Sequence, residues 1–220
     1  MPRGASRRSG REAGYGAKLI GEVAAVILVR YAVLVIDMLE EFVRGRLKAE
    51  AAEAIVPRIA NLLAFARSYG IPVVYAVDSH YPKVDRELEL WGPHAIRGSP
   101  EARVVEELKP LETDYVVHKR RYDAFFETDL DLLLRELKVD AVILTGIHTH
   151  ICVQQTAAGA FYRGYRVVVP VDCVAAATKE WHERGLEYMR AFFGAELTTS
   201  DQLIERLKRE LGAPPASQYM

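Results

Sequence analysis

Three side chains that could carry out nucleophilic catalysis each follow an apolar segment of the sequence. They are Asp37, Lys119 and Cys152. A cysteine thiolate attacks a carbonyl carbon, a carboxylate can accept the thiol proton, and a nearby ammonium lowers the thiol pKa. Cys152 also opens a predicted helix, whose free backbone N–H groups favour a thiolate. We therefore expect a covalent catalytic site, although a lone cysteine is more often a small core residue, the role we assign to Cys173.

A second group of residues has the composition of a metal site. Asp78 and His80 are separated by one residue, which places both side chains on the same side of an extended segment. His94 would supply a third ligand, and Asp85 and Glu87 between the histidines are extra oxygen ligands or, alternatively, exposed loop charges. Histidine and carboxylate ligands with open positions suit zinc, and also iron or manganese.

Several aromatic residues lie close in sequence to these catalytic and metal-site candidates. Most aromatic side chains fill a core, but those that face a pocket would stack on a flat aromatic substrate. The residues concerned are Phe42, Trp91, Tyr122, Phe125 and Phe126.

The segments that must position these residues alternate between two patterns. Nearly unbroken Val- and Ile-rich runs predict six strands buried on both faces, at 32–36, 72–77, 115–117, 141–145, 166–169 and 195–198. Helical spacing predicts helices at 50–69, 129–137, 152–162, 180–193 and 201–211, the last with Ser200 as its N-cap. This alternation predicts an α/β fold, a three-layer αβα arrangement around a six-stranded, mostly parallel sheet. Ligands bind beyond the carboxyl ends of such strands, where the candidate residues converge.

The overall composition excludes several classes of protein. The 220 residues carry 29 basic and 30 acidic side chains, so the chain lacks the basic excess of a nucleic-acid binder. The most apolar stretch, 19–36, is interrupted by Glu22 and Arg30, so we expect no membrane span. Two cysteines cannot build a disulfide scaffold, which indicates a cytoplasmic protein. A single asparagine, Asn61, favours a thermophilic protein, because amides deamidate quickly when hot.

One domain is expected over residues 19–211. Residues 1–18 hold five basic side chains and one acidic one without apolar periodicity, which predicts a disordered basic tail or a start codon placed too early. Residues 212–220 contain two prolines and are expected to form a loose C-terminal tail.

Three motifs in chain order resemble the isochorismatase-like cysteine hydrolases, and within them the nicotinamidases. The family's first strand ends in a catalytic aspartate followed five residues later by phenylalanine, which matches 37–42. Its lysine precedes a Tyr-x-x-Phe segment, which matches 119–126. Its nucleophile motif, Gly-x-x-Thr-x-x-Cys-Val-x-x-Thr-Ala, matches 146–157. The resemblance runs from about residue 33 to residue 207.

The resemblance implies a mechanism. Asp37 accepts the proton of Cys152, the thiolate attacks an amide carbon, and Lys119 stabilises the charged pair. The backbone N–H groups of His148 and Cys152 form the oxyanion hole, and a cis peptide bond precedes His148.

The resemblance to nicotinamidases also implies a metal site and a substrate pocket. Asp78, His80 and His94 would hold the metal, most often zinc, with Glu87 as an additional ligand, and the metal would hold a pyridine nitrogen. The pocket residues are Phe42, Trp91, Tyr122, Phe126 and Ile147.

Some positions depart from the family pattern. Leu39 and Glu40 replace a glutamine and an asparagine, and His148-Thr149-His150 replaces Ala-Thr-Asp. The two histidines either reshape the pocket wall or simply fill a loop.

We expect hydrolysis of nicotinamide to nicotinate and ammonia, as in NAD salvage. A ureido or carbamoyl amide is the alternative substrate, and a non-catalytic metabolite-binding protein is the remaining alternative. Because isochorismatases proper lack the nucleophilic cysteine, Cys152 argues against a vinyl-ether hydrolase. The expected partners are a small-molecule amide and further copies of the chain, as a dimer or tetramer.

Overall fold

The computed structural model describes residues 29–214, and its centre is one sheet of seven strands. The strand order is β3-β2-β1-β4-β5-β7, with β6 paired to β4, and all these pairings are parallel. The order reverses between β1 and β4, which is where an open parallel sheet forms its ligand crevice. The strands are β1 Tyr31–Ile36, β2 Val73–Asp78, β3 Tyr115–Lys119, β4 Ala141–Ile147, β5 Arg166–Pro170, β6 Val174–Ala175 and β7 Glu196–Thr198.

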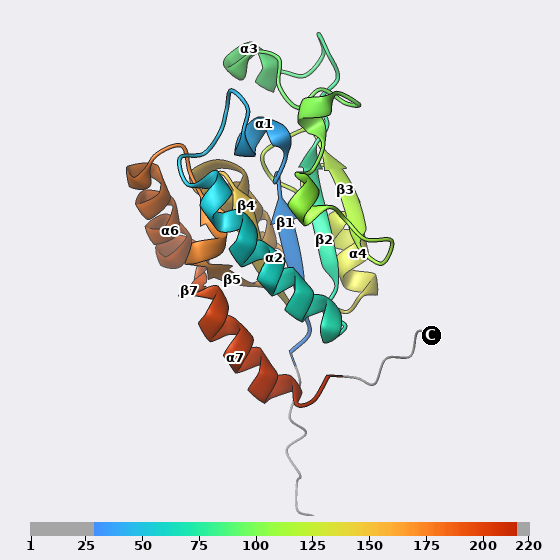
Figure 1. The fold of residues 1–220 in the computed structure, drawn as a ribbon, viewed down its shortest axis with the longest axis vertical. Coiled ribbons are helices and arrows are strands. Elements are labelled where there is room, and N and C mark those ends of the chain that lie inside the picture. The colour runs from blue at the N-terminus through green and yellow to red at the C-terminus, as the bar shows by residue number, and fades with distance from the viewer. Residues whose placement is uncertain (1–28, 215–220) are drawn as a thin grey trace, which may run out of the picture.

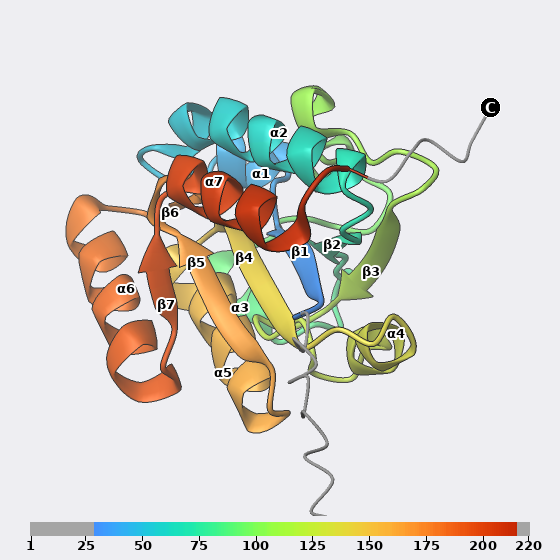
Figure 2. The same ribbon diagram turned by 90° about the horizontal axis from the view of Figure 1, so that it is seen from below.

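Helices cover both faces of the sheet, as Figures 1 and 2 show. On one face lie α2 (Ala52–Ser68) and α7 (Ser200–Leu211), and on the other lie α4 (Leu130–Glu136), α5 (Gln154–Tyr162) and α6 (Lys179–Phe193). Alternate residues of β1 pack into two separate cores because successive strand side chains point to opposite faces. The predicted three-layer α/β fold is therefore confirmed.

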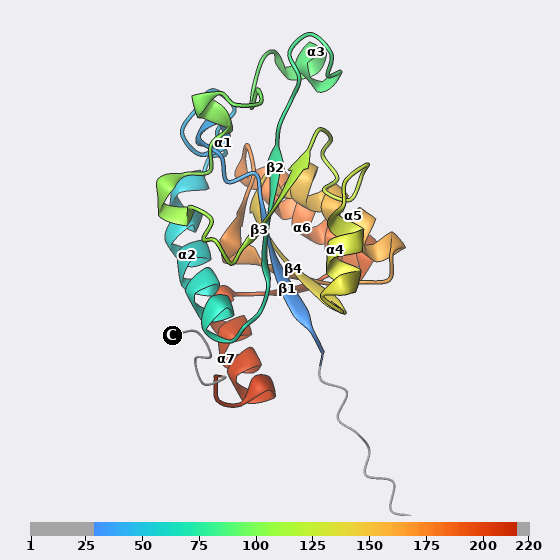
Figure 3. The ribbon, with the colours of Figure 1, turned by 90° about the vertical axis from the view of Figure 1, so that its right-hand side faces the viewer.

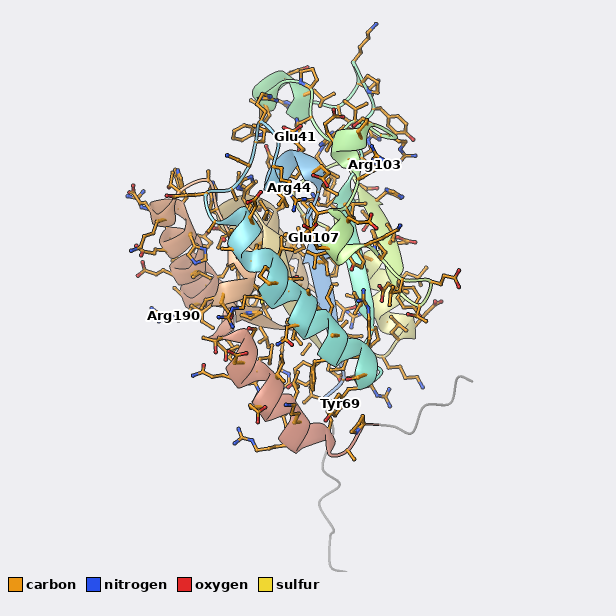
Figure 4. The ribbon with its side chains drawn as sticks, in the orientation of Figure 1. Glu41, Arg44, Tyr69, Arg103, Glu107 and Arg190 are labelled. Carbon is orange, nitrogen blue, oxygen red and sulfur yellow. The ribbon has the colours of Figure 1, made fainter. Side chains whose placement is uncertain are left out.

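Two short helices lie beyond the carboxyl ends of the strands, α1 (Glu40–Val43) and α3 (Glu87–Trp91) (Figure 3). The start of α1 is fixed by a backbone bridge between Leu39 and Val104. Arg44 at the end of α1 pairs with Glu107 at 2.6 Å (Figure 4). The chain that leaves β1 is thus held from both ends of this short helix.

Gly146 near the end of β4 permits a close approach to β1. Its φ is +110°, and a Cβ atom there would lie 1.9 Å from the carbonyl oxygen of Ile36. Only glycine fits this position without displacing a strand. The approach brings the chain that follows β4 next to Asp37, the first residue after β1.

The structure differs from the predicted elements in detail. β6 is a seventh strand, too short to leave a pattern in the sequence, and α1 and α3 have no helical periodicity of their own. The predicted N-cap Ser200 is wrong: Thr199 caps α7 in a capping box with Gln202. The predicted tail at 1–18 lies outside the described residues, as do 19–28 of the predicted domain and 215–220 of the C-terminal tail. Among the helices of residues 29–214, none has both the length and the apolar character needed to cross a bilayer.

Candidate active site

Asp37, Lys119 and Cys152 come together at the carboxyl ends of β1, β3 and β4. The Lys119 ammonium lies 2.7 Å from Asp37 Oδ2 and 2.6 Å from Asp78 Oδ1. An oxygen of Asp37, an oxygen of Asp78 and the Cys152 sulfur lie within 4.8 Å of one another. All four side chains are buried, so their charges interact without much screening by water. The predicted proximity of carboxylate, ammonium and thiol is what the structure shows.

The buried ammonium balances two carboxylates. Burial raises the pKa of Asp37, the charge of Asp78 raises it further, and Lys119 opposes both, which leaves the Asp37 pKa at about 6. Burial alone would lower the pKa of Lys119, but Asp37 and Asp78 outweigh it and hold that pKa well above its usual value. Lys119 is therefore a permanent cation, while Asp37 can exchange a proton near neutral pH.

The surroundings of Cys152 favour its neutral thiol over the thiolate, contrary to the expectation from sequence. Burial raises its pKa well above the usual value, and the favourable charge of Lys119 does not compensate. The residue also does not begin a regular α-helix: it lies in a π-helical turn, Thr149–Val153, that precedes α5. A carboxylate oxygen of Asp37 lies within 4.8 Å of the Cys152 sulfur, so the thiol proton has an acceptor close by. Activation therefore depends on proton transfer to Asp37 more than on a preformed thiolate.

Asp78, His80, Glu87 and His94 form a buried cluster next to the triad. Each offers one ligand atom, and these atoms lie within 4.8 Å of one another. His80 Nε2 is 3.6 Å from Asp78 Oδ2 and 3.8 Å from Glu87 Oε2. Asp78 ends β2, His80 lies in the loop that follows it, Glu87 begins α3 and His94 lies just after α3.

The donor atoms of this cluster fit a divalent metal. His80 Nε2 and both carboxylate oxygens of Glu87 are buried without a hydrogen-bond partner. Burial and the charge of Asp78 raise the Glu87 pKa to about 7, as expected for a carboxylate buried beside another carboxylate. The other nitrogen of each histidine is anchored: Nδ1 of His94 donates to the Gly92 carbonyl at 2.8 Å, and Nδ1 of His80 donates to Asp85 at 3.2 Å. Such outer partners orient metal-binding histidines.

Asp85 is therefore an outer partner of the cluster and is not brought into it as a ligand. Its carboxylate accepts hydrogen bonds from His80, from the backbone N–H of Tyr81 at 2.8 Å and from Arg120. All of its oxygens are thus engaged with protein donors, and Glu87 supplies the free carboxylate.

Cys152 of the triad and Asp78, Glu87 and His94 of the cluster line one cavity of about 540 Å³. Its walls are mostly aromatic and aliphatic, a composition typical of small-molecule sites. The lining residues are Phe42, Arg46, Leu47, Lys48, Asp78, Glu87, Trp91, His94, Tyr122, His148, His150, Ile151, Cys152, Ala177 and Trp181. Trp91 Nε1–H donates to the Tyr122 hydroxyl at 2.8 Å, which joins two of these walls.

Two predicted pocket residues are not brought to this cavity. Ile147 is fully buried and packs into the core beside the sheet. Phe126 is half exposed and lines a separate surface hollow with Leu90. Phe125, named only as an aromatic residue, packs on Tyr165 in the core. Successive side chains of a strand point to opposite faces of the sheet. Ile147, the last residue of β4, is therefore close to the pocket in sequence while its side chain points into the core.

Sequence reasoning missed Trp181, which lines the cavity from the first turn of α6. Its ring stacks on His150 with centroids 5.0 Å apart and planes 17° apart. In the sequence Trp181 stands four and eight residues before Gly185 and Met189, the buried residues of α6, so the helical pattern does not distinguish it from a residue that packs on the core. His148, one of the departures from the family pattern, donates from Nε2 to the Leu47 carbonyl at 3.0 Å. This hydrogen bond joins two residues of the cavity lining.

The peptide bond between Ile147 and His148 is cis, as the resemblance implies. The turn that begins with His148 carries the backbone N–H groups of both His148 and Cys152. These are the two groups assigned to the oxyanion hole.

Residues 31–202 match the isochorismatase domain family. The chain belongs to the isochorismatase family. It is a member of the isochorismatase-like hydrolase superfamily, and its three-layer fold is the one that the solved structures of this superfamily share.

Three solved structures illustrate the range of relatives. The N-carbamoylsarcosine amidase of Thermoplasma acidophilum is 39% identical, with 79% of this chain and 98% of that chain covered and a TM-score of 0.74. The nicotinamidase of Bacillus subtilis is 32% identical over 77% of this chain and 99% of that one, also with a TM-score of 0.74. The pyrazinamidase of Pyrococcus horikoshii in complex with zinc is 27% identical over 77% and 99%, with a TM-score of 0.71.

Proposed function

We propose that this isochorismatase-family hydrolase cleaves the carboxamide of nicotinamide to nicotinate and ammonia. The observation that carries the proposal is that one aromatic-walled cavity is lined both by Cys152, the nucleophile of the triad, and by three members of the buried set of metal donors, Asp78, Glu87 and His94. A carboxamide on a flat heteroaromatic ring has one group for each: an acyl carbon for the thiol and a ring nitrogen for the metal. NAD salvage in the cytoplasm is the corresponding physiological role.

The triad would act by acyl transfer. Asp37 takes the proton of Cys152, and the sulfur attacks the amide carbon to form a C–S bond. The oxyanion accepts hydrogen bonds from the backbone N–H groups of His148 and Cys152. Asp37 returns its proton to the amide nitrogen, the C–N bond breaks and ammonia leaves. Water then hydrolyses the thioester, with Asp37 accepting its proton and the thiol regenerated.

The second site would hold and orient the ring. A divalent ion would be bound by Asp78, His80, Glu87 and His94, and we propose zinc because the Pyrococcus pyrazinamidase structure is a complex with zinc. When bound there, the ion supplies a Lewis-acid position for a ring nitrogen. Lys119 keeps the two neighbouring carboxylates, Asp37 and Asp78, at a fixed separation through its two ion pairs.

A carbamoyl amide is the second candidate substrate. The observation that favours it is the 39% identity to the N-carbamoylsarcosine amidase, over nearly the whole of that enzyme. Such a substrate has no pyridine nitrogen, so it offers the donor cluster no aromatic ligand. Hydrolysis of the two substrates should therefore respond differently to loss of the cluster.

The test is ammonia release from nicotinamide and from N-carbamoylsarcosine by enzyme of measured metal content. We expect release from nicotinamide that disappears in Cys152→Ala and falls on chelation. Ammonia release from N-carbamoylsarcosine but not from nicotinamide would overturn nicotinamide as the substrate and favour the carbamoyl amide. Retention of activity by Cys152→Ala would overturn the thioester mechanism.

A further inference from the structure

We propose that His150 and Trp181 form a distal subsite that binds a flat, uncharged ring or similar apolar group of the substrate, beyond the ring that carries the amide. This inference rests on the proposed function and extends it to substrates larger than nicotinamide. It concerns the cavity wall built by the π-helical turn and the first turn of α6.

The aromatic wall continues well past the metal donors. Neighbouring ring centroids are 6.0 Å apart for His94 and Phe42, 5.9 Å for Phe42 and His148, 5.9 Å for His148 and His150, and 5.0 Å for His150 and Trp181. All five rings line the same cavity. A single pyridine ring at His94 cannot reach the whole of this run. In Figures 1 and 2, α6, which carries Trp181, lies away from α3.

The volume of the cavity supports the same conclusion. A cavity of about 150 Å³ suffices for benzene. The cavity here is about 540 Å³, which leaves space for a second group after one ring is bound. Trp181 is 48% exposed, so its ring offers apolar surface that the rest of the described chain does not cover.

Trp181 and His150 are held in place by the packing of α6. A Cβ atom on Gly185 would lie 3.0 Å from His150 Cα, so glycine lets α6 rest directly on the π-helical turn. Thr149 Oγ1 and His182 Nδ1 form a hydrogen bond of 3.0 Å across the same contact. A wall fixed in this way loses little entropy when a ligand binds, which is a feature of preorganised sites.

The character of the wall favours an uncharged group. Burial lowers the pKa of His150, so its imidazole is neutral at neutral pH. Arg184, which lies over the Trp181 ring, is paired with Glu180 at 2.6 Å, and this pairing offsets its charge. The alternative is a subsite for an anionic group, because Lys48 also lines the cavity and its ammonium would attract a negative charge.

The experiment compares nicotinamide with nicotinamides that carry a phenyl or a carboxyphenyl group at ring position 5 or 6. We expect full-length, metal-loaded enzyme to have a kcat/KM for at least one phenyl compound that equals or exceeds the value for nicotinamide. Trp181→Ala should lower that value about tenfold, a larger factor than its effect on the value for nicotinamide. Trp181→Phe should restore most of the loss, and Phe192→Ala, an exposed aromatic of the same helix outside the cavity, should have no effect.

Binding measurements separate failure of the subsite from failure of the proposed function. Calorimetric titration of Cys152→Ala enzyme with the corresponding nicotinic acids needs no turnover. Trp181-dependent binding of a phenyl acid, without hydrolysis of any pyridine amide by the wild type, would keep the subsite and overturn the proposed function. Phenyl compounds that are neither bound nor hydrolysed as well as nicotinamide would overturn the subsite. A preference for carboxyphenyl compounds that Lys48→Ala removes would also overturn it in favour of an anion site.

Discussion

The protonation state of Asp37 controls the rate of the proposed reaction. Burial raises the pKa of the Cys152 thiol, which therefore needs a base to remove its proton. Only ionised Asp37 can accept that proton, and its pKa is about 6. We therefore expect kcat/KM for the amide to be constant above about pH 7 and to fall about tenfold per pH unit well below pH 6. A pH–rate profile with metal content measured at each pH tests this. A flat profile between pH 5 and 7.5 at constant metal content would contradict it.

Asp85 shows that a residue can matter to a metal site without binding the metal. Its hydrogen bond to His80 Nδ1 leaves Nε2 as the atom that faces the cluster. Asp85→Asn should weaken metal affinity about 10- to 100-fold, because outer partners of metal-binding histidines have effects of that size. Equilibrium dialysis against zinc measures the change. Glu89→Gln, which alters an exposed carboxylate of the nearby helix α3, is the control, and equal affinities of the two variants would refute the role of Asp85.

The sequence predicts those residues of the candidate site that lie at the ends of strands. Asp37, Asp78 and Lys119 are found where the alternation of elements placed them, because parallel strands end at one edge. Trp181 could not be found in this way, since its role depends on how closely α6 packs through Gly185. The neutral state of Cys152 also could not be predicted, because burial by the surrounding fold outweighs the nearby charge.

Among the elements, α7 has the clearest local signal for its start. The Thr199 side chain accepts a hydrogen bond from the Gln202 backbone, and the Gln202 side chain accepts one from the Thr199 backbone. Thr199→Ala should lower the free energy of unfolding by about 1 kcal/mol and leave kcat unchanged, since α7 lies far from the cavity lining. Denaturant unfolding with Arg209→Ala as a solvent-side control measures this. Identical midpoints for the two variants would show that the cap contributes nothing.

The long elements of the fold were predictable, and the short ones were not. The six predicted strands and five predicted helices all have counterparts, with boundaries shifted by at most two residues. β6 has two residues and α1 has four, lengths at which neither strand alternation nor helical spacing can be recognised. The helix predicted at 152–162 takes in the last two residues of the π-helical turn, because π- and α-helix differ in backbone hydrogen bonding and not in apolar pattern.

For the molecule as a whole, metal binding and stability should be coupled. Three buried donor atoms lack hydrogen-bond partners, and a cation that binds only the folded chain stabilises it. At a free zinc concentration of about 100 times Kd, the gain is about 2.7 kcal/mol. We expect a chelator to lower Tm by about 5–10 °C in scanning calorimetry. Cys152→Ala should keep this shift and His94→Ala should lose most of it. An unchanged Tm in the wild type would contradict a metal at this site.

Two further properties of the whole molecule, a thermophilic origin and assembly into a homo-oligomer, stay predictions. The exposed aromatic residues Tyr162 and Phe192 show that apolar surface remains on the described chain. Such surface on a single chain is compatible with assembly, and sedimentation of the intact protein measures its mass directly.

One carboxylate belongs to both halves of the site. Asp78 Oδ1 contacts Lys119, while Asp78 Oδ2 faces His80. Because a single negative charge is divided between the ammonium and the cluster, cation binding at the cluster and protonation of the triad are thermodynamically linked, and the linkage is reciprocal. Each equilibrium therefore reports on the other. The rate at which Cys152 reacts with an alkylating reagent becomes a gauge of metal occupancy that can be read with no substrate present.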